Sequence, residues 1–337
     1  APIEINCGES GSTLRFLIPL ALALYPDRDL VFIGQGRLLE RPLTPYLKLF
    51  EEQSISYQLN DQLHIRGKLQ SGKYALSGKI SSQFITGLLF ALPLLHGVST
   101  IEVTDELESK NYVEMTLQTL QTFGITVCRQ GDSTFIVQGD QVYQQKNVEV
   151  EGDYSQGAFF YAANFVGSRI FPKGLNPDSI QGDRAIITIL KDFCKEENII
   201  LDVSDIPDLV PALAVAAAFR DGKKTQFIHA ERLRLKESDR ITTTCQMLHA
   251  VGANIRESKD GMIIRGKAQL KGTRNRAFFC HNDHRIAMAA AIAAIGCKES
   301  IQLKGAECVE KSYPNFWEDY QKLGGNICEY EEMESRS

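Results

Sequence analysis

Five stretches of the chain share one hydrophobic pattern, in which a cluster of small or polar residues precedes an apolar run of helix length. These stretches are 8–24, 81–95, 152–166, 206–219 and 282–296. Their apolar residues cover nearly all sides of a helix, which predicts five buried helices. The N-terminus of a helix carries unpaired N–H groups and a partial positive charge, so it favours anions. The pattern therefore predicts a protein built around an anionic ligand.

A longer unit repeats around these helices. After each apolar run we expect a strand and then a second helix with a one-sided apolar stripe, followed in three units by two short strands. This β-α-β-α-β-β repeat begins near residues 3, 76, 147, 202 and 276. The strands expected after the apolar runs are 29–36, 99–106, 168–174, 224–230 and 299–305, with a last strand at 326–330. The second helices are expected within 40–52, 110–124, 182–193, 237–252 and 315–325.

The length of 337 residues favours two domains, each able to bury a core. We expect an α/β fold in which each domain encloses its apolar helices within outer helices and sheets. The stretch 171–183 contains Gly, Pro and Asn and lies between two helix patterns, so the expected domains are 1–180 and 181–337. Because five units form an odd number, we also expect a sixth, mostly before Ala1, whose absence would truncate the first domain.

Composition and charge argue against several classes of function. A net charge of −5 offers no basic stripe for nucleic acid. The eight cysteines show no CxxC spacing, which favours reduced thiols in a cytoplasmic protein over a disulfide framework or a zinc site. The first apolar run is too short to span a membrane and contains Arg15 and Pro19, while Glu4 and Glu9 precede it. We therefore expect neither a membrane span nor a signal peptide.

Candidate cations stand singly at the predicted helix starts or in the loops before them. Any one such Lys or Arg is usually a solvated surface residue, but recurrence at similar points of a repeat favours an anion site. A ligand with several anionic groups needs cations from different elements, because charge-assisted contacts fix its orientation. The candidates are Arg15, Arg41, Lys236, Arg240, Arg285 and Lys311.

Other polar residues at helix starts also have a purely structural interpretation. The triplet 81–83 (Ser-Ser-Gln) suits N-capping. Asp208 begins an apolar helix, where a carboxylate complements the helix dipole. The neighbours Lys236 and Glu237 would ordinarily lie on the surface. His281 and His284 with one Asp provide too few ligands for a metal site, and Asp283 with His284 would rather orient Arg285.

Six short motifs, taken together and in order, identify a family. Over all 337 residues the chain resembles the 5-enolpyruvylshikimate-3-phosphate synthases. The resemblance implies transfer of an enolpyruvyl group from phosphoenolpyruvate to the 5-hydroxyl of shikimate-3-phosphate, with release of phosphate. It also implies a monomer with a two-domain inside-out α/β barrel, five of whose six units are present, and no metal or organic cofactor. The motifs are 38–42 (LLERP), 81–83 (SSQ), 206–208 (IPD), 234–240 (RLKESDR), 281–288 (HNDHRIAM) and 310–314 (EKSYP).

The same resemblance assigns roles to individual residues. Asp208 would hold and deprotonate the 5-hydroxyl of shikimate-3-phosphate. Glu237 would carry the proton that the methylene carbon of phosphoenolpyruvate gains and loses, and Lys236 would contact substrate and tune Glu237. The residues that would grip phosphoenolpyruvate are Arg41, Arg240, Arg285 and Lys311, supported by Gly11 and Arg15. Those that would bind shikimate-3-phosphate are Ser81, Ser82 and Ser109 with Tyr112 at its phosphate, and Gln83 at a ring hydroxyl.

The chain departs from the family pattern in three places. The family's N-terminal Lys-Ser segment, followed by an Arg, has no counterpart here, so we expect weak or absent turnover from these 337 residues. Arg232 stands where the family often has Asn, and Glu9 stands where an Asn or a similar residue is usual. These changes would alter the grip on an anionic substrate.

Two alternatives remain open at this point. One is enolpyruvyl transfer to a UDP-amino sugar such as UDP-N-acetylglucosamine, which shares the fold; the SSQ and ESKNY (108–112) features argue against it. The other is a non-catalytic protein that binds anions or serves in an assembly.

Overall fold

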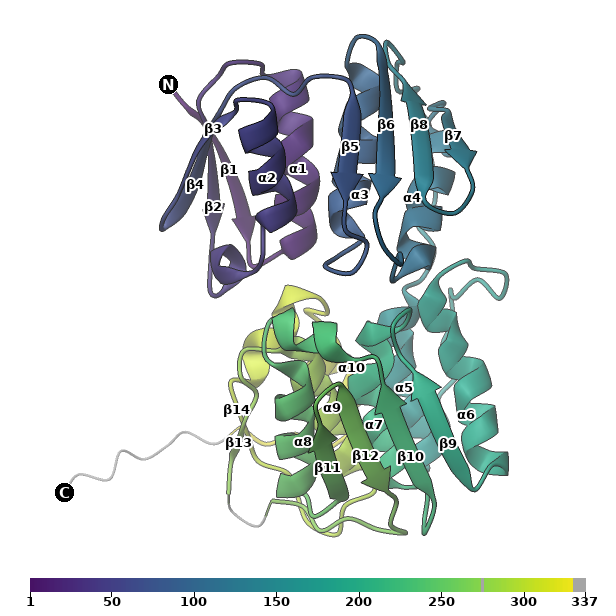
Figure 1. Cartoon of the computed structure of the whole chain (residues 1–337). Coiled ribbons are helices and arrows are strands. Elements are labelled where there is room, and N and C mark those ends of the chain that lie inside the picture. The colour runs from purple at the N-terminus through teal and green to yellow at the C-terminus, as the bar shows by residue number, and fades with distance from the viewer. Residues whose placement is uncertain (274–275, 330–337) are drawn as a thin grey trace, which may run out of the picture.

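The computed structural model describes residues 1–273 and 276–329. The chain folds into two lobes placed end to end, each with its own hydrophobic core (Figure 1). The core of the first lobe runs from Cys7 to Val137, and that of the second from Tyr154 to Phe316. The predicted two-domain α/β fold is confirmed.

The first lobe contains two similar units, each with a four-stranded sheet. In both, the first two strands pair in parallel, and the chain between them forms a helix. A hairpin adds the other two strands, giving the orders β1-β2-β4-β3 and β5-β6-β8-β7. The first unit comprises β1 (Ile3–Gly8), α1 (Gly11–Leu24), β2 (Leu30–Gly34), η1 (Leu38–Glu40), α2 (Thr44–Glu52), β3 (Ser56–Leu59) and β4 (Gln62–Arg66). The second comprises β5 (Lys73–Leu76), α3 (Gln83–Ala91), η2 (Leu92–Leu94), β6 (Val98–Val103), α4 (Lys110–Thr122), β7 (Val127–Gln130) and β8 (Thr134–Gln138).

The second lobe has one such sheet, of order β11-β12-β10-β9, and a two-stranded sheet, β13-β14. Its first elements are α5 (Tyr154–Val166), η3 (Gly182–Ala185), α6 (Ile186–Lys195), β9 (Asn198–Asp202), η4 (Pro207–Leu209), α7 (Val210–Ala218) and β10 (Lys224–Ile228). They are followed by η5 (Glu231–Leu235), α8 (Arg240–Ala250), β11 (Asn254–Ser258), β12 (Gly261–Arg265) and β13 (Phe278–Phe279). The last are α9 (His284–Ala294), β14 (Leu303–Lys304), η6 (Ala306–Lys311) and α10 (Phe316–Lys322).

The five apolar runs form the inner helices, as predicted. All nine residues of α7 and ten of the eleven in α9 are buried. Both helices are rich in alanine, whose small side chain lets α5, α7 and α9 approach one another closely. In the first lobe α1 packs on α3 in the same way. The more polar second helices α2, α4, α6, α8 and α10 also form where their one-sided stripes predict them.

Three predicted strands do not form among the described residues, namely the one beginning near residue 147, the segment 168–174 and the described part of 326–330. The segment 168–174 forms none, because Phe171 is 86% exposed and Pro172 has no N–H to donate to a ladder. The described part of the last predicted strand, 326–329, is likewise not a strand, and Tyr330 lies outside the described residues.

The predicted domain boundary near residue 180 is wrong. Helix α5 belongs to the second lobe, because its apolar residues pack against α7 and α9 in that core. The chain passes between the lobes within 141–153, where no helix or strand forms until α5 begins. Most side chains of that segment are exposed, including Val148 and Val150, and the strand that the repeat predicts to begin near residue 147 does not form.

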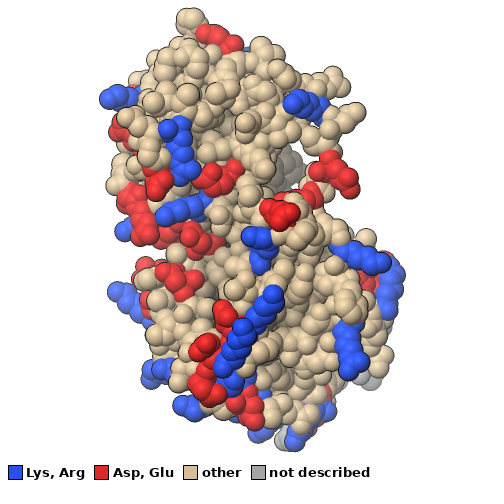
Figure 2. All heavy atoms as spheres, turned by 90° about the vertical axis from the view of Figure 1, so that its right-hand side faces the viewer, with Lys and Arg blue, Asp and Glu red and all other residues tan. Residues whose placement is uncertain are grey.

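The lobes meet where several helices begin. Contacts join the loop before α1 to η6, and the start of α4 to η3, η4 and η5. Within the part of the chain that the structure describes, no helix combines the length and the apolar character needed to cross a bilayer. On the face shown in Figure 2, Lys and Arg are interspersed with Asp and Glu and form no continuous basic stripe.

Candidate active site

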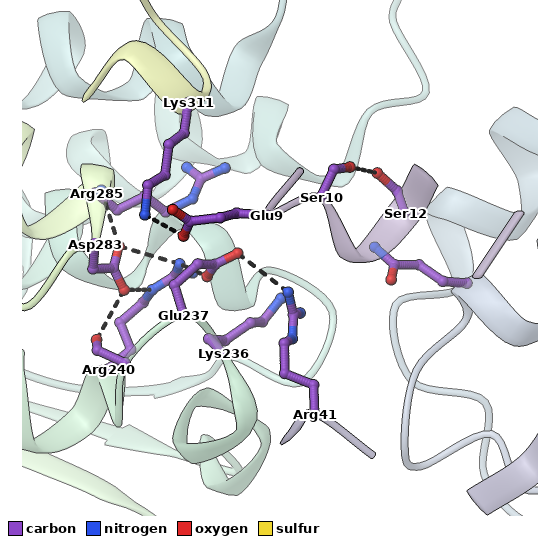
Figure 3. Close-up of polar contacts among 12 residues, drawn as sticks. Glu9, Ser10, Ser12, Arg41, Lys236, Glu237, Arg240, Asp283, Arg285 and Lys311 are labelled. Carbon is purple, nitrogen blue, oxygen red and sulfur yellow. Dashed lines mark hydrogen bonds and ion pairs between the residues drawn. The ribbon is translucent and has the colours of Figure 1, made fainter. Parts of the chain in front are cut away.

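A buried network of ion pairs at the junction of the lobes is centred on Arg240 (Figure 3). Its Nε lies 3.0 Å from Asp283 Oδ2, its Nη1 lies 2.9 Å from Asp208 Oδ1, and its Nη2 pairs with Glu237. Asp283 caps α9, since its Oδ1 accepts the backbone N–H of Arg285 at 3.0 Å. Burial disfavours the charged guanidinium, but the three carboxylates outweigh it and hold the pKa of Arg240 above its ordinary value.

The Asp208 carboxylate is surrounded by positively charged side chains and makes no capping hydrogen bond to α7. Its Oδ1 lies 3.4 Å from Lys236 Nζ and 3.6 Å from Arg285 Nε, in addition to its contact with Arg240. No side chain caps α7, but Asp208 stands in the first turn of η4, which runs directly into α7, so its place agrees with the dipole interpretation. Burial would raise the pKa of this carboxyl, but Lys236 and the two guanidiniums hold it well below its usual range.

Glu237 and Lys236 are not surface residues. Their side chains are 21% and 24% exposed, and Glu237 joins the lobes because its Oε1 lies 3.6 Å from Arg41 Nη1. Burial raises the pKa of Glu237, but Arg240 and Arg41 lower it more, so the net pKa is below the ordinary value. Burial lowers the pKa of Lys236 despite the opposing carboxylate of Asp208. The surroundings therefore favour the ionised form of Glu237 and make Lys236 easier to deprotonate than a solvated lysine.

Arg15 connects two helix starts within the first lobe. Its Nη1 donates to Gln83 Oε1 at 2.7 Å, its guanidinium lies 5.0 Å from the centroid of the Phe84 ring, and its Nε is buried without a partner. Burial, and then the nearby Arg41, lower the pKa of Arg15 to about 10. A Cβ placed on Gly11 would lie 2.7 Å from Arg41 Nη1, so this glycine leaves room for the Arg41 guanidinium at the start of α1.

The predicted serines lie at helix starts, but neither Ser82 nor Ser109 acts as a side-chain cap. At the first of these helices Ser81 Oγ accepts the N–H of Gln83 at 3.3 Å, which supports the capping interpretation for Ser81 alone. Ser109 adopts the left-handed conformation at φ 56°, and its Oγ accepts from Arg232 Nη2 at 2.9 Å across the junction. Neither buried serine therefore caps its helix, and the Ser109 hydroxyl contacts the second lobe through Arg232.

Tyr112 and Asp183 extend the network beside Asp208. Tyr112 Oη lies 3.4 Å from Asp208 Oδ2 and 3.4 Å from Asp183 Oδ2, while Asp183 Oδ1 is buried without a partner. Burial, then the charge of Asp208, raise the pKa of Asp183 to about 7. Sequence reasoning missed Asp183, although its position at the start of a second helix (GDRA) matches that of other predicted site residues.

Two ion pairs between the lobes were not predicted from the sequence. Glu9 pairs with Lys311, and Arg232 pairs with Glu108. The sequence marks Glu9 and Arg232 only as unusual residues, because their partners lie far away in the chain. The network otherwise contains the predicted cations Arg41, Lys236, Arg240, Arg285 and Lys311, whereas Arg15 lies beside it.

His284 lies beside the network as a neutral, buried group. Its Nδ1 is buried without a partner, and burial together with the charges of Arg285 and Arg240 lowers its pKa to about 4. Among the described residues no three His, Cys, Asp or Glu side chains are grouped as a metal site would require. Asp283, rather than His284, fixes Arg285 through its backbone N–H.

The lowered pKa of His284 predicts a loss of stability in mild acid. An unfolded histidine has a pKa of about 6.5, so below that pH the unfolded chain binds a proton that the buried His284 does not. The free energy of unfolding is therefore unaffected by this group above pH 6.5 and falls as the pH is lowered toward 4. The shift corresponds to at most about 3 kcal/mol. Urea unfolding between pH 4.5 and 7.5 should show a shallower dependence for His284→Gln than for the unsubstituted chain. His249→Gln, which changes an exposed histidine of α8, serves as the control; equal slopes for all three proteins would contradict the prediction.

A large groove is lined by other residues, among them Asn111 and Gly182, the chain neighbours of Tyr112 and Asp183. It has a volume of about 1090 Å³ and runs between α4 and the segment 177–188. Glutamine, asparagine and aliphatic side chains line it, with few charges, so it does not meet the demands of an anion site. The candidate site is the charged junction.

Comparison with known proteins identifies the family. A family model described as EPSP synthase (3-phosphoshikimate 1-carboxyvinyltransferase) matches residues 1–320. The chain belongs to this family. The 3-phosphoshikimate 1-carboxyvinyltransferase of Clostridium kluyveri is 46% identical over 97% of this chain and 80% of its own length. That of Clostridium perfringens is 45% identical over 95% and 79%.

The fold leads to the same family. A solved EPSP synthase from Acinetobacter baumannii has a TM-score of 0.74 and 25% identity, covering 96% of this chain and 79% of that one. The resemblance predicted from six short motifs is thus confirmed. The chain spans about four fifths of the length of these relatives.

Proposed function

We propose that this chain transfers the enolpyruvyl group of phosphoenolpyruvate to the 5-hydroxyl of shikimate-3-phosphate and releases phosphate. Family membership supports the reaction. The observation that places this reaction at the junction of the lobes in our proposal is that cations from both lobes surround Asp208 and Glu237 there. Both substrates carry a phosphate and a carboxylate, so together they can use several cations that one small anion could not.

The two substrates divide the junction between them. Arg41, Arg240, Arg285 and Lys311 would hold phosphoenolpyruvate, since these cations come from separate elements and can contact separate anionic groups. Shikimate-3-phosphate would place its phosphate on Ser81, Ser82 and Ser109 beside Tyr112, and a ring hydroxyl on Gln83. Burial of Ser82 and Ser109, with neither hydroxyl used for capping, supports this division.

The reaction proceeds by addition and elimination. The 5-hydroxyl oxygen bonds to C2 of phosphoenolpyruvate as Asp208 accepts the hydroxyl proton and C3 gains a proton by way of Glu237. Glu237 then takes a proton back from C3 as the bond between C2 and the phosphate oxygen breaks, which restores the double bond. The proton held by Asp208 passes to the departing phosphate. General acid–base groups of this kind typically contribute about 10²–10⁴ in rate.

Substrate binding would adjust both carboxyl groups for proton transfer. In the free chain Asp208 and Glu237 have lowered pKa values, chiefly because Lys236, Arg240, Arg285 and Arg41 oppose the effect of burial. Anionic substrate groups placed on the same cations would offset their charge. The pKa of each carboxyl would then rise, which makes Asp208 a stronger base and Glu237 a better proton carrier in the complex.

Phosphate release tests the proposed function. The chain is incubated with phosphoenolpyruvate and either shikimate-3-phosphate or UDP-N-acetylglucosamine, and phosphate and the enolpyruvyl product are measured. Turnover and thermal protection with shikimate-3-phosphate alone would support it, and turnover too slow to detect together with no protection would refute it. Extending the chain with a family Lys-Ser segment tests whether turnover rises, and light scattering tests the expected monomer.

Gly11→Ala is expected to weaken phosphoenolpyruvate binding by displacing Arg41. The new Cβ would lie 2.7 Å from Arg41 Nη1, and the end of this flexible side chain would give way. We expect Kd for phosphoenolpyruvate to rise by about tenfold, or about 1.4 kcal/mol, with a much smaller change for shikimate-3-phosphate. Titration calorimetry measures both, and the melting temperature should change little. Equal losses for the two ligands would contradict this role for Gly11.

A further inference from the structure

The carboxylate of Glu9 forms an ion pair with Lys311, one of the cations assigned to substrate. Glu9 precedes α1 in the first lobe, and its Oε2 pairs with Nζ of Lys311 at the end of η6 in the second lobe (Figure 3). The same ammonium donates to the backbone carbonyl of Asn282 at 2.7 Å. Two acceptors of the protein therefore take up most of the hydrogen-bonding capacity of Lys311.

The surroundings of Glu9 hold its carboxylate in this place. The side-chain amide of Asn282 lies 3.2 Å from Glu9 Oε1 and 3.0 Å from Oε2. A Cβ at Gly36 would lie 3.0 Å from Oε2 and 3.1 Å from Cδ. The chain thus provides a donor to the carboxylate, and glycine at position 36 leaves room for it.

We propose that Glu9 is a positioning residue that occupies Lys311 until a substrate anion displaces it. The proposal rests on the proposed function only in assigning Lys311 to phosphoenolpyruvate. A phosphate or carboxylate that approaches this ammonium while Glu9 holds it is repelled by the Glu9 carboxylate, which weakens its binding. Displacement frees Lys311 and, since Glu9 belongs to the first lobe, also removes one of the ionic links between the lobes.

The proposal predicts the direction in which Glu9 affects affinity. A residue that binds substrate would weaken binding when removed, whereas a residue that competes with substrate strengthens binding when its charge is removed. Glu9→Gln keeps the shape of the side chain and its contact with Asn282 but makes it a weaker partner for Lys311. We expect Kd for phosphoenolpyruvate and for inorganic phosphate to fall by about fivefold, the upper end for one partly exposed ion pair.

Titration calorimetry with inorganic phosphate needs no turnover, so it tests Glu9 even if the proposed reaction is wrong. Glu40→Gln serves as the control, because it removes a carboxylate of the same lobe whose side chain is 69% exposed and pairs with Arg37 in i,i+3 spacing. It should leave both Kd values unchanged. In the steady state Glu9→Gln should lower KM for phosphoenolpyruvate and leave KM for shikimate-3-phosphate unchanged. A merely structural role would alter both.

A second substitution keeps the test decisive. Asn282 has φ 55°, which glycine adopts readily, so Asn282→Gly removes the amide that holds Glu9 without straining the backbone. It should tighten phosphate binding by less than Glu9→Gln does, and it should add nothing in the double variant. Unchanged or weaker phosphate binding by Glu9→Gln would overturn the proposal, as would a full, additive effect of Asn282→Gly.

Discussion

Replacing Arg240 with leucine is expected to lower the free energy of unfolding by about 3–5 kcal/mol, among the largest effects of any single substitution in this chain. The side chain is 1% exposed and pairs with Asp208, Glu237 and Asp283, the last of which has no exposed area. Removing the guanidinium leaves buried negative charges without their main partner. Urea unfolding at neutral pH measures the loss, and unfolding at lower pH should reduce it because protonation of the carboxyls removes the uncompensated charge.

Two comparison variants separate charge from geometry. Arg240→Lys keeps the charge, but one ammonium cannot reproduce the forked contacts of a guanidinium, so an intermediate loss is expected. Arg37→Leu removes an arginine whose side chain is 57% exposed and pairs with Glu40, and it should change stability little. If Arg240→Leu were no less stable than Arg37→Leu, the network would have no structural role.

The sequence predicted those parts of the fold that depend on local pattern. Runs such as 210–218 are apolar on every side, so they could only be inner helices, and alternation within 254–265 specified a hairpin. The division between the lobes was misplaced because it depends on which core receives α5. Both cores accept an apolar helix, and nothing within 152–166 distinguishes them.

The candidate site shows the same limit. Cations such as Arg240 and Arg285 were predicted because each stands at a helix start, which is a local feature. The pairing of Glu9 with Lys311 joins residues about 300 positions apart and depends on how one lobe meets the other. Asp183 was missed for a similar reason, since its high pKa results from burial beside Asp208 rather than from its own sequence context.

Asp208→Asn is expected to reduce turnover by about 10²–10⁴, the range for losing a general acid–base group. The amide preserves the shape of the side chain but cannot take the proton of the 5-hydroxyl. Some stability is lost as well, because Asp208 Oδ1 lies near Lys236, Arg240 and Arg285. Phosphate release per folded molecule, ligand titration and melting temperature separate these effects, and shikimate-3-phosphate should still bind.

Lys236→Gln provides the matched comparison, since it removes a charge from the same ion pair but leaves the Asp208 carboxylate in place. It should preserve the base while weakening its hold on substrate, so its turnover should exceed that of Asp208→Asn. The pH profile of kcat distinguishes the two variants further. Asp208→Asn should remove the acidic limb of the profile, because the base is lost. Lys236→Gln should move that limb to higher pH, because the ammonium lowers the pKa of Asp208. Near-normal turnover by Asp208→Asn would exclude Asp208 as the base and leave Glu237 and Lys236 as the proton-transfer groups.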